Sequence, residues 1–374
     1  MSRMSFNNFS LICSNCEKEH DINILPPRCS SCNEPLEVRI KKIDVDRNIF
    51  KGREFSMWRY SEFIFTRKMI SLFEGGTPLL KANRLSEYSG LKNIYLKNET
   101  VNPTGSFKDR GTAVGLNFAL QKNNKLIGTL STGNMAKSVA AYAAKAGVKA
   151  IVFVKDTISS EKINLISMFG QEIHRVKEDY GKLYFKIMDD YKDVFFINSD
   201  YPARIEGQKT IAYEICEQLN WDVPEYIVIP VSSGGNFSAI YKGFKEFFEA
   251  GFISTIPELI GVQAEGCSPI YKAYIQGKPQ IEEFSKPHTI AHAIENPYPP
   301  SGNRVLKIVK ENYGKIVAVN DEEIIFSQKL LSLKEGIFAQ PASAAALGAL
   351  LKLKDKRFFE KNDKIVLIIT GMNQ

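Results

Sequence analysis

The chain has 374 residues, which at about 150 residues per domain corresponds to two or three domains. Its 44% hydrophobic and 24% charged residues exclude an intrinsically disordered or collagen-like protein. The net charge of +7 comes without a dense lysine and arginine stripe, so it suits a small anionic ligand at least as well as a nucleic acid. The sequence has no signal-peptide-like start and no run of about 18 apolar residues, and we expect a cytoplasmic protein outside the membrane.

Four of the six cysteines form two closely spaced pairs. They are Cys13-x2-Cys16 and Cys29-x2-Cys32, with twelve residues between the pairs. Two such knuckles bring four thiolates to one point, which is the donor set of a structural Zn²⁺ site. Disulfides are the alternative, but no secretion signal is present, and Cys216 and Cys267 stand apart from the pairs. We predict a zinc ribbon over residues 1–44, whose folding energy comes from the metal.

The charge of this ribbon argues against nucleic-acid binding. Residues 1–45 contain six basic and six acidic side chains, so their net charge is zero. They also lack an aromatic and basic face that would stack on bases and contact phosphates. We therefore expect a structural or interface role for the ribbon and no nucleic-acid partner.

After the ribbon, residues 44–68 are charged and aromatic, and we interpret them as a partly helical connector. Farther along, short β-branched runs alternate with longer helical stretches. Strands are predicted at 151–154, 226–231, 259–263 and 365–369, and helices at 136–146 and 237–250. This alternation is typical of α/β layers around mostly parallel sheets.

A glycine turn directly follows the predicted strand at 226–231 and precedes a helix. Gly234 and Gly235 let the backbone approach an anion, and the helix N-terminus offers free N–H groups and a positive dipole end. Neighbouring side chains add further donors: Ser232, Ser233 and Asn236. The turn has neither the Gly-Lys-Ser/Thr ending of a P-loop nor the G-x-G-x-x-G dinucleotide pattern. It predicts a phosphate site, and a plain strand-to-helix turn is the alternative.

A second turn, residues 102–111, has the sequence NPTGSFKDRG and leads into an alanine-containing helical run. Lys108 lies just inside the helix start, where the positive end of the dipole disfavours its charge. An amine that loses its charge readily is suited to forming an imine. A solvated surface lysine is the alternative interpretation.

A third turn, Ser131-Thr132-Gly133-Asn134, leads into an alanine-rich helix. Its hydroxyl, amide and backbone N–H groups form a natural seat for a carboxylate, although alone they also fit a simple helix N-cap. A phosphate site, an imine-forming lysine and a carboxylate seat together indicate a pyridoxal-phosphate enzyme.

From Gly75 to its last residues the chain resembles the threonine synthases, within the fold type II (tryptophan-synthase-β-like) pyridoxal-phosphate enzymes. The NPTGSFKDRG segment is highly specific for them. Further similar segments are the third turn with residues 140–147, residues 204–210, the Gly-Gly-Asn loop and residues 340–344. A four-cysteine N-terminus also occurs in some members of the family. The resemblance implies two α/β domains around a cleft, in addition to the small zinc ribbon.

The resemblance also assigns roles at the cofactor. Lys108 would carry pyridoxal 5'-phosphate as a Schiff base and then move protons. Asn134 would hydrogen-bond the ring hydroxyl of the cofactor, and Thr370 would donate its hydroxyl to the pyridine nitrogen. The cofactor phosphate would be held by the glycine loop: Ser232, Ser233, Gly234, Gly235 and Asn236.

For the substrate, the resemblance places Ser131 and Thr132 near the carboxylate. Arg204 would bind a second phosphate, since a guanidinium fork matches phosphate oxygens. The implied reaction converts O-phospho-L-homoserine and water to L-threonine and phosphate. Lys108 would remove the α-proton, a β-proton would follow, and water would add at the β-carbon after the phosphate leaves.

Rival interpretations remain open. A phosphoserine-using β-replacement enzyme such as cysteate synthase shares the lysine motif. A serine/threonine dehydratase is favoured by Ser232 and Ser233, where the family commonly has Gly-Asn, but it needs no Arg204 and typically has no ribbon. A non-enzymatic zinc-ribbon scaffold leaves the intact lysine and glycine loop unexplained. A zinc hydrolase would need a glutamate after the first histidine of the pair His288 and His292, and the chain has threonine there.

We expect the ribbon at 1–44, a larger α/β domain assembled from 45–90 and 205–374, and a smaller α/β domain at 91–204 inserted between its halves. The cofactor would lie in the cleft, and the substrate phosphate would draw the smaller domain closed. The expected partner is a small anionic amino acid. Members of the family are often homodimers, but the residues do not decide the oligomeric state.

Overall fold

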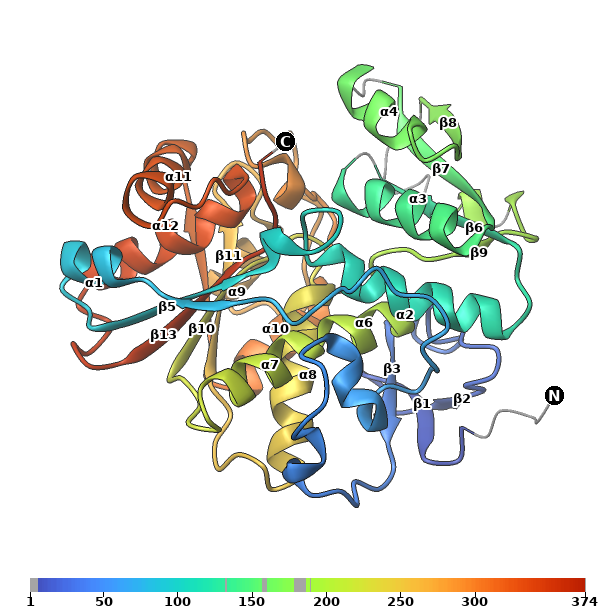
Figure 1. Cartoon of the computed structure of the whole chain (residues 1–374). Helices are drawn as coiled ribbons and strands as arrows, with labels where there is room; N and C mark the ends of the chain where they lie inside the picture. Colours follow the sequence, from blue (N-terminus) through green and yellow to red (C-terminus); the bar gives the residue numbers. More distant parts are fainter. Residues whose placement is uncertain (1–5, 132, 157–159, 178–185, 189, 374) are drawn as a thin grey trace.

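The computed structural model describes residues 6–131, 133–156, 160–177, 186–188 and 190–373. Three β-sheets occur in this described part of the chain (Figure 1). The smallest is antiparallel, in the order β2-β1-β3, and carries the cysteine pairs near the N-terminus. Its strands are β1 (Phe9–Cys13), β2 (Glu19–His20) and β3 (Leu36–Ile40).

The largest sheet has six strands in the order β12-β11-β10-β13-β5-β4. Neighbours pair in parallel except β4, which runs antiparallel to β5. The predicted strands at 226–231, 259–263 and 365–369 are confirmed as β10, β11 and β13, because their apolar runs are buried on both faces. The strands are β4 (Leu79–Lys81), β5 (Asn93–Asn98), β10 (Tyr226–Pro230), β11 (Glu258–Ala264), β12 (Lys315–Val319) and β13 (Lys364–Ile369).

The third sheet is parallel, with the order β8-β7-β6-β9, and lies with α3 and α4 at the upper right of Figure 1. The predicted strand at 151–154 is confirmed within β7. The strands are β6 (Leu126–Leu130), β7 (Lys149–Lys155), β8 (Glu172–Val176) and β9 (Phe195–Phe196).

Helices cover the sheets and begin at several of the predicted turns. The predicted helices at 136–146 and 237–250 are confirmed as α3 and α8, and the connector 44–68 contains two short 3-10 helices. The described α-helices are α1 (Asn83–Ser89), α2 (Lys108–Gln121), α3 (Asn134–Ala146), α4 (Ser160–Ser167), α6 (Pro202–Gln208), α7 (Thr210–Gln218), α8 (Gly235–Glu249), α9 (Pro269–Ile275), α10 (Gly302–Glu311), α11 (Asp321–Glu335) and α12 (Pro341–Asp355). The 3-10 helices are η1 (Arg47–Phe50), η2 (Met57–Phe63), η3 (Glu99–Val101) and η4 (His292–Ile294).

Alternate residues of β13 enter two hydrophobic cores. Leu367 belongs to a core that contains Leu347 of α12, whereas Val366 belongs to a core that contains Phe237 of α8. Since successive side chains of a strand point to opposite faces, both faces of the six-stranded sheet are covered by helices. This burial fixes the strand ends from which the candidate site projects.

One predicted domain boundary is corrected by the sheet topology. The division placed residues 93–98 in the smaller domain, but β5 pairs with β13 and β4 in the six-stranded sheet. Ile94 and Leu96 are buried in the same core as Leu367, so the strand belongs with the larger sheet. The sequence does not mark β5 as a buried strand, because its end contains the charged residue Lys97. That lysine is buried only because it forms an ion pair with the distant Glu214. The other predicted domain edges stay predictions.

None of the helices in the described part of the chain is both long enough and apolar enough to cross a membrane.

Candidate functional site

Lys108 is the first residue of α2 and follows a tightly held loop. The backbone N–H of Phe107 donates to the carbonyl of Thr370 at 3.0 Å, and Ser106 pairs with Gly371 in a β-bridge. Burial, reinforced by the positive charge of Arg204, lowers the pKa of Lys108 to about 7. Among the described residues, no carboxylate lies within salt-bridge distance of this amine. A lysine with this pKa is neutral in about half of the molecules at pH 7, and the neutral form is a nucleophile.

The glycine loop after β10 is enclosed by two backbone carbonyls. Gly234 has φ +89°, and a Cβ built on it would lie 2.8 Å from the carbonyl oxygen of Ser301. A Cβ on Gly235 would lie 2.8 Å from the carbonyl oxygen of Ser199. Both positions therefore require glycine, the first for its conformation and both for space. The loop opens directly onto the N-terminus of α8, whose first N–H groups have no partner inside the helix.

Some polar groups around this loop have hydrogen-bond partners within the protein, and others have none. Ser233 accepts a hydrogen bond on its hydroxyl from the Asn296 side chain at 3.0 Å, and on its carbonyl from the Ser301 N–H at 3.0 Å. Asn236 is buried, yet neither its side-chain oxygen nor its side-chain nitrogen has a hydrogen-bond partner. Ser232 is half-buried. Buried polar atoms without partners are costly, so Asn236 indicates a place for a polar ligand.

Asn134 is the first residue of α3, and its amide donates to the side-chain oxygen of Gln340 at 3.1 Å. Its amide nitrogen is also 3.1 Å from a Cβ built on Gly371, which follows β13. The structure thus brings Asn134 to the loop that also holds the Lys108 turn. Ser131 lies at the end of β6, and its hydroxyl accepts from the Gly133 N–H at 3.3 Å. Thr132 lies outside the described residues.

Thr370 lies directly after β13 and is buried. Its hydroxyl forms a hydrogen bond of 2.8 Å with the hydroxyl of Ser343, which also contacts the backbone of Gly371. In the sequence, residues 340–344 are recognisable only as a motif. In the structure, Gln340 contacts Asn134 and Ser343 contacts Thr370. These contacts depend on tertiary structure, which a sequence pattern does not report.

Arg204 lies in α6 and is fully buried. Its guanidinium donates to the Thr112 hydroxyl at 3.0 Å and to the carbonyl of Lys108 at 3.1 Å. Burial lowers its pKa to about 10, against the opposing charge of Asp109. Arg204 thus contacts the first turn of α2, which begins at Lys108, and its role toward a substrate phosphate stays a prediction.

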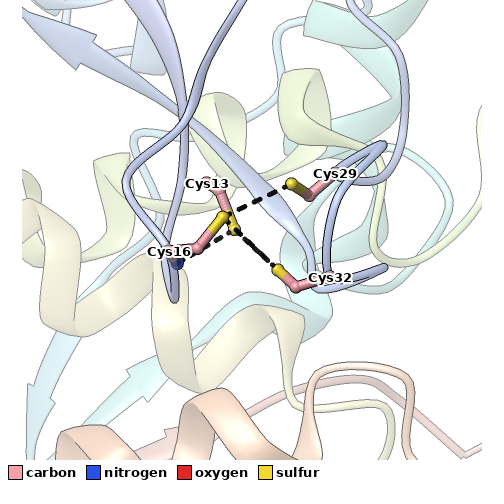
Figure 2. A group of neighbouring side chains, drawn as sticks. All are labelled: Cys13, Cys16, Cys29 and Cys32. Atoms are coloured by element: carbon pink, nitrogen blue, oxygen red, sulfur yellow. Dashed lines mark hydrogen bonds between the residues drawn. The ribbon is translucent and has the colours of Figure 1, made fainter.

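The four N-terminal cysteines converge at one point, as Figure 2 shows. Their sulfur atoms all lie within 4.8 Å of one another, with separations of 3.4 Å for Cys13 and Cys32 and 3.6 Å for Cys16 and Cys29. All four are free thiols, so the disulfide alternative is not realised. Four sulfurs at about 2.3 Å from a tetrahedral zinc would be about 3.8 Å apart, so this donor set fits the metal.

This cluster is the one group of three or more metal-ligating side chains found in the described residues. The histidine pair considered for a zinc hydrolase does not join it. His292 is largely exposed and hydrogen-bonds Glu295 at 2.8 Å, and the backbone of His288 binds Gly266.

Residues 70–371 match the family model described as pyridoxal-phosphate dependent enzyme. The chain belongs to this family. It is 39% identical to threonine synthase of Methanocaldococcus jannaschii, over 96% of this chain and 91% of the relative. It is 37% identical to threonine synthase of Methanosarcina acetivorans, over 97% of this chain and 91% of the relative.

The fold of this chain is also found in solved structures. Maize serine racemase superimposes with a TM-score of 0.68 at 22% identity, covering 80% of this chain and 88% of the racemase. The predicted fold class, a type II α/β pyridoxal-phosphate fold with an added four-cysteine segment, is thereby confirmed. With threonine synthases among its relatives, this pyridoxal-phosphate-dependent enzyme is a lyase.

The residues of this pyridoxal-phosphate-dependent enzyme fit its cofactor. Lys108 is half-buried and offers an amine with a pKa of about 7 for the aldehyde. Gly234 and Gly235 leave no room for side chains against the carbonyls of Ser301 and Ser199, and they place the loop at the positive end of α8. Asn236 has buried polar atoms in need of a partner. Each of these observations concerns the chain itself and is independent of the family match.

Proposed function

We propose that this enzyme converts O-phospho-L-homoserine and water to L-threonine and phosphate. The observation that carries the proposal is Lys108, a half-buried residue whose amine has a pKa of about 7 and no carboxylate partner among the described residues. Its support comes from two relatives named threonine synthase that cover nearly the whole chain.

Lys108 has two successive tasks in this proposal. As a neutral amine it would hold the cofactor through its aldehyde, and as a free amine it would accept the proton of the substrate α-carbon. A pKa near 7 serves both tasks, because the amine can take up and release a proton at neutral pH. Bound pyridoxal phosphate would supply an electron sink that stabilises negative charge at the substrate carbons.

The proposed cofactor ligands come from three separate strand ends. The loop Ser232 to Asn236 would bind the phosphate through backbone N–H groups and side-chain donors. Thr370 would donate its single hydroxyl proton to the pyridine nitrogen, so that Ser343 would donate to the Thr370 oxygen. Asn134 would bind the ring hydroxyl. A hydroxyl rather than a carboxylate at the pyridine nitrogen keeps that nitrogen unprotonated.

For the substrate, we propose Ser131 and Thr132 at the carboxylate and Arg204 at the phosphate. Arg204 has no carboxylate within salt-bridge distance in the described residues, and its Nε has no hydrogen-bond partner. A buried guanidinium with spare donors suits a doubly charged phosphate. We also propose that the cleft lies between the six-stranded and four-stranded sheets, since these residues come from both.

We further propose that Cys13, Cys16, Cys29 and Cys32 bind one structural Zn²⁺. The convergence of four free thiols supports this proposal. Four cysteines that bind a metal rather than form disulfides are typical of a reducing compartment, and we propose a cytoplasmic location. A small anionic amino acid as partner, no nucleic acid, and a homodimeric assembly complete the proposal.

A product assay tests the reaction. Purified enzyme loaded with pyridoxal phosphate is offered O-phosphohomoserine alone and, separately, O-phosphoserine with sulfite. Threonine and phosphate in equal amounts from the first substrate are expected. Cysteate from the second, without turnover of the first, would replace threonine synthesis by β-replacement on a substrate one carbon shorter. 2-Oxobutanoate from added threonine, with neither of these products, would favour a dehydratase.

A further inference from the structure

The cysteine ribbon packs against α10. This helix directly follows Ser301, whose carbonyl lies against Gly234 of the glycine loop. Asn303 donates to the Glu34 carboxylate at 2.8 Å, and Arg304 forms a buried ion pair with Glu37. These contacts fix the first turn of α10, immediately after Ser301. The ribbon therefore touches the structure that shapes the phosphate cradle.

Arg28 reaches beyond α10 and joins two separate loops. One guanidinium nitrogen lies 3.0 Å from the carboxylate of Asp200 and donates to the carbonyl of Pro300 at 2.8 Å. The other terminal nitrogen donates to the carbonyl of Asn33, inside the ribbon. The Asp200 side chain is fully buried, and that of Arg28 is 11% exposed. Burial of this kind makes the ion pair costly to break from one side.

Asp200 and Pro300 are the immediate neighbours of the two carbonyls that enclose the cradle. Asp200 follows Ser199, whose carbonyl oxygen closes over Gly235. Pro300 precedes Ser301, whose carbonyl oxygen closes over Gly234 and whose N–H binds the carbonyl of Ser233. A single guanidinium thus holds both walls of the cradle at once. Its position in turn depends on the ribbon, because Arg28 directly precedes Cys29.

We propose that Arg28 couples the metal state of the ribbon to the affinity of the glycine loop for the cofactor phosphate. The proposal rests on the functions proposed above for the four cysteines and for the loop. A metal bound by Cys29 and Cys32 fixes the knuckle that carries Asn33, and Asn33 orients the Arg28 guanidinium. With the knuckle fixed, Arg28 keeps the loops at Asp200 and Pro300 in place. Loss of the metal frees the knuckle and loosens both walls.

Coupling between two sites is reciprocal at equilibrium, so cofactor binding must strengthen metal binding by the same factor. Arg28 is a positioning residue in this scheme, since it touches neither ligand. Its effect should be confined to the phosphate end of the cofactor. Pyridoxal, which has the same aldehyde but no phosphate, provides the probe that separates this effect from a general loss of structure.

The experiment measures equilibrium dissociation constants for pyridoxal phosphate and for pyridoxal on the full-length enzyme freed of cofactor. The absorption band of the lysine-linked cofactor is the signal. The parent, Arg28→Met and the control Arg39→Met are compared, each loaded with zinc and after removal of zinc by a chelator. Arg39 is a matched control because it lies in the same ribbon, is 47% exposed, and contacts only glutamates of the ribbon among its ion pairs in the described residues.

We expect zinc removal and Arg28→Met each to weaken pyridoxal phosphate binding about tenfold, within the usual range of coupling between sites. The two changes together should weaken it no further, pyridoxal binding should stay unchanged, and Arg39→Met should behave like the parent. Equal affinities of parent and Arg28→Met for pyridoxal phosphate would overturn the proposal. So would an equal loss of affinity for both probes.

Because Arg28→Met leaves a buried carboxylate without its cation, the double variant Arg28→Met with Asp200→Asn provides a second test. Its loss of phosphate-dependent affinity should match that of the single variant. Parental affinity in a folded double variant would contradict the coupling.

If the parent holds no zinc, the metal assignment fails. The comparison of the parent with Arg28→Met still shows whether Arg28 supports phosphate binding by the glycine loop. If no lysine-linked band forms, the cofactor role of Lys108 fails instead.

Discussion

In the six-stranded sheet, Leu367 and Val366 turn into two apolar cores, whereas the ribbon has four thiols at its centre. The ribbon is not independent of the rest of the chain, because Leu36 and Val38 of β3 join a core that also contains Phe118 of α2. The catalytic part is therefore held by apolar burial together with buried ion pairs, and the ribbon by burial on one side and four clustered thiols on the other. A substitution in a core should therefore lower the stability of the whole fold. A substitution of the thiols should affect only the cysteine knuckles and the residues that they contact.

The largest effect is expected from Lys108→Ala in the catalytic part. The variant should lose the lysine-linked absorption band and at least about 10²-fold in activity, because both attachment and proton transfer use this amine. Its fold and metal content should match the parent, as judged by circular dichroism and metal analysis. Lys122→Ala, just after the other end of α2, is the control and should keep both band and activity. A retained band in Lys108→Ala would move the attachment site elsewhere.

Leu367→Ala tests the claim that the sheet is held by apolar burial. Deleting this fully buried side chain should lower the free energy of unfolding by about 2–5 kcal/mol, as measured by urea denaturation. Leu333, 72% exposed on α11, is the control, and its replacement by alanine should change stability by less than about 0.5 kcal/mol. Equal stability of the two variants would show that β13 is not the centre of two cores.

Cys13→Ser combined with Cys16→Ser tests the ribbon by itself. The double variant should lose about one zinc per chain, while the absorption band at saturating cofactor persists, since the thiols do not contact the site. Its unfolding free energy should fall less than that of Leu367→Ala. Replacing the two buried cysteines of the catalytic part, Cys216 and Cys267, by alanine should leave the metal content unchanged. Unchanged metal in the first variant would refute the zinc site.

The smallest effect is expected from removing the positive charge of Arg204, which acts on the amine of Lys108. Arg204 lowers the pKa of Lys108, so Arg204→Met should raise that pKa above its present value of about 7. Only the neutral amine attaches the cofactor, and the pH midpoint of attachment should therefore move upward, with less attachment at pH 7. Arg39→Met should leave the midpoint in place. A midpoint that stays or falls in Arg204→Met would show that Arg204 does not act on this amine.

The sequence predicted the elements whose signal is local. The strands β10, β11 and β13 are continuous apolar runs, and the turns at Lys108, Asn134 and Gly234 have short characteristic motifs. The strand β5 was assigned to the wrong domain because its partners lie far away in the chain and its polar end is neutralised by tertiary contacts.

Long-range polar contacts escaped prediction for the same reason. The hydroxyl of Ser343 meets that of Thr370, and Arg28 meets Asp200, only because the completed fold brings separate loops together. Neither residue type nor spacing marks such a pair in one sequence. Residue types that carry chemistry can thus be found from motifs, whereas the residues that position them are found from the structure.

The attachment site itself can be measured directly. Enzyme loaded with pyridoxal phosphate is reduced with borohydride, digested and mapped by mass spectrometry, which locates the lysine that carries the cofactor. We predict that the reduced cofactor is found on Lys108 and that the unreduced control, whose imine hydrolyses during digestion, has no labelled lysine. A label on another lysine, such as Lys137 of α3, would contradict the assignment of the site.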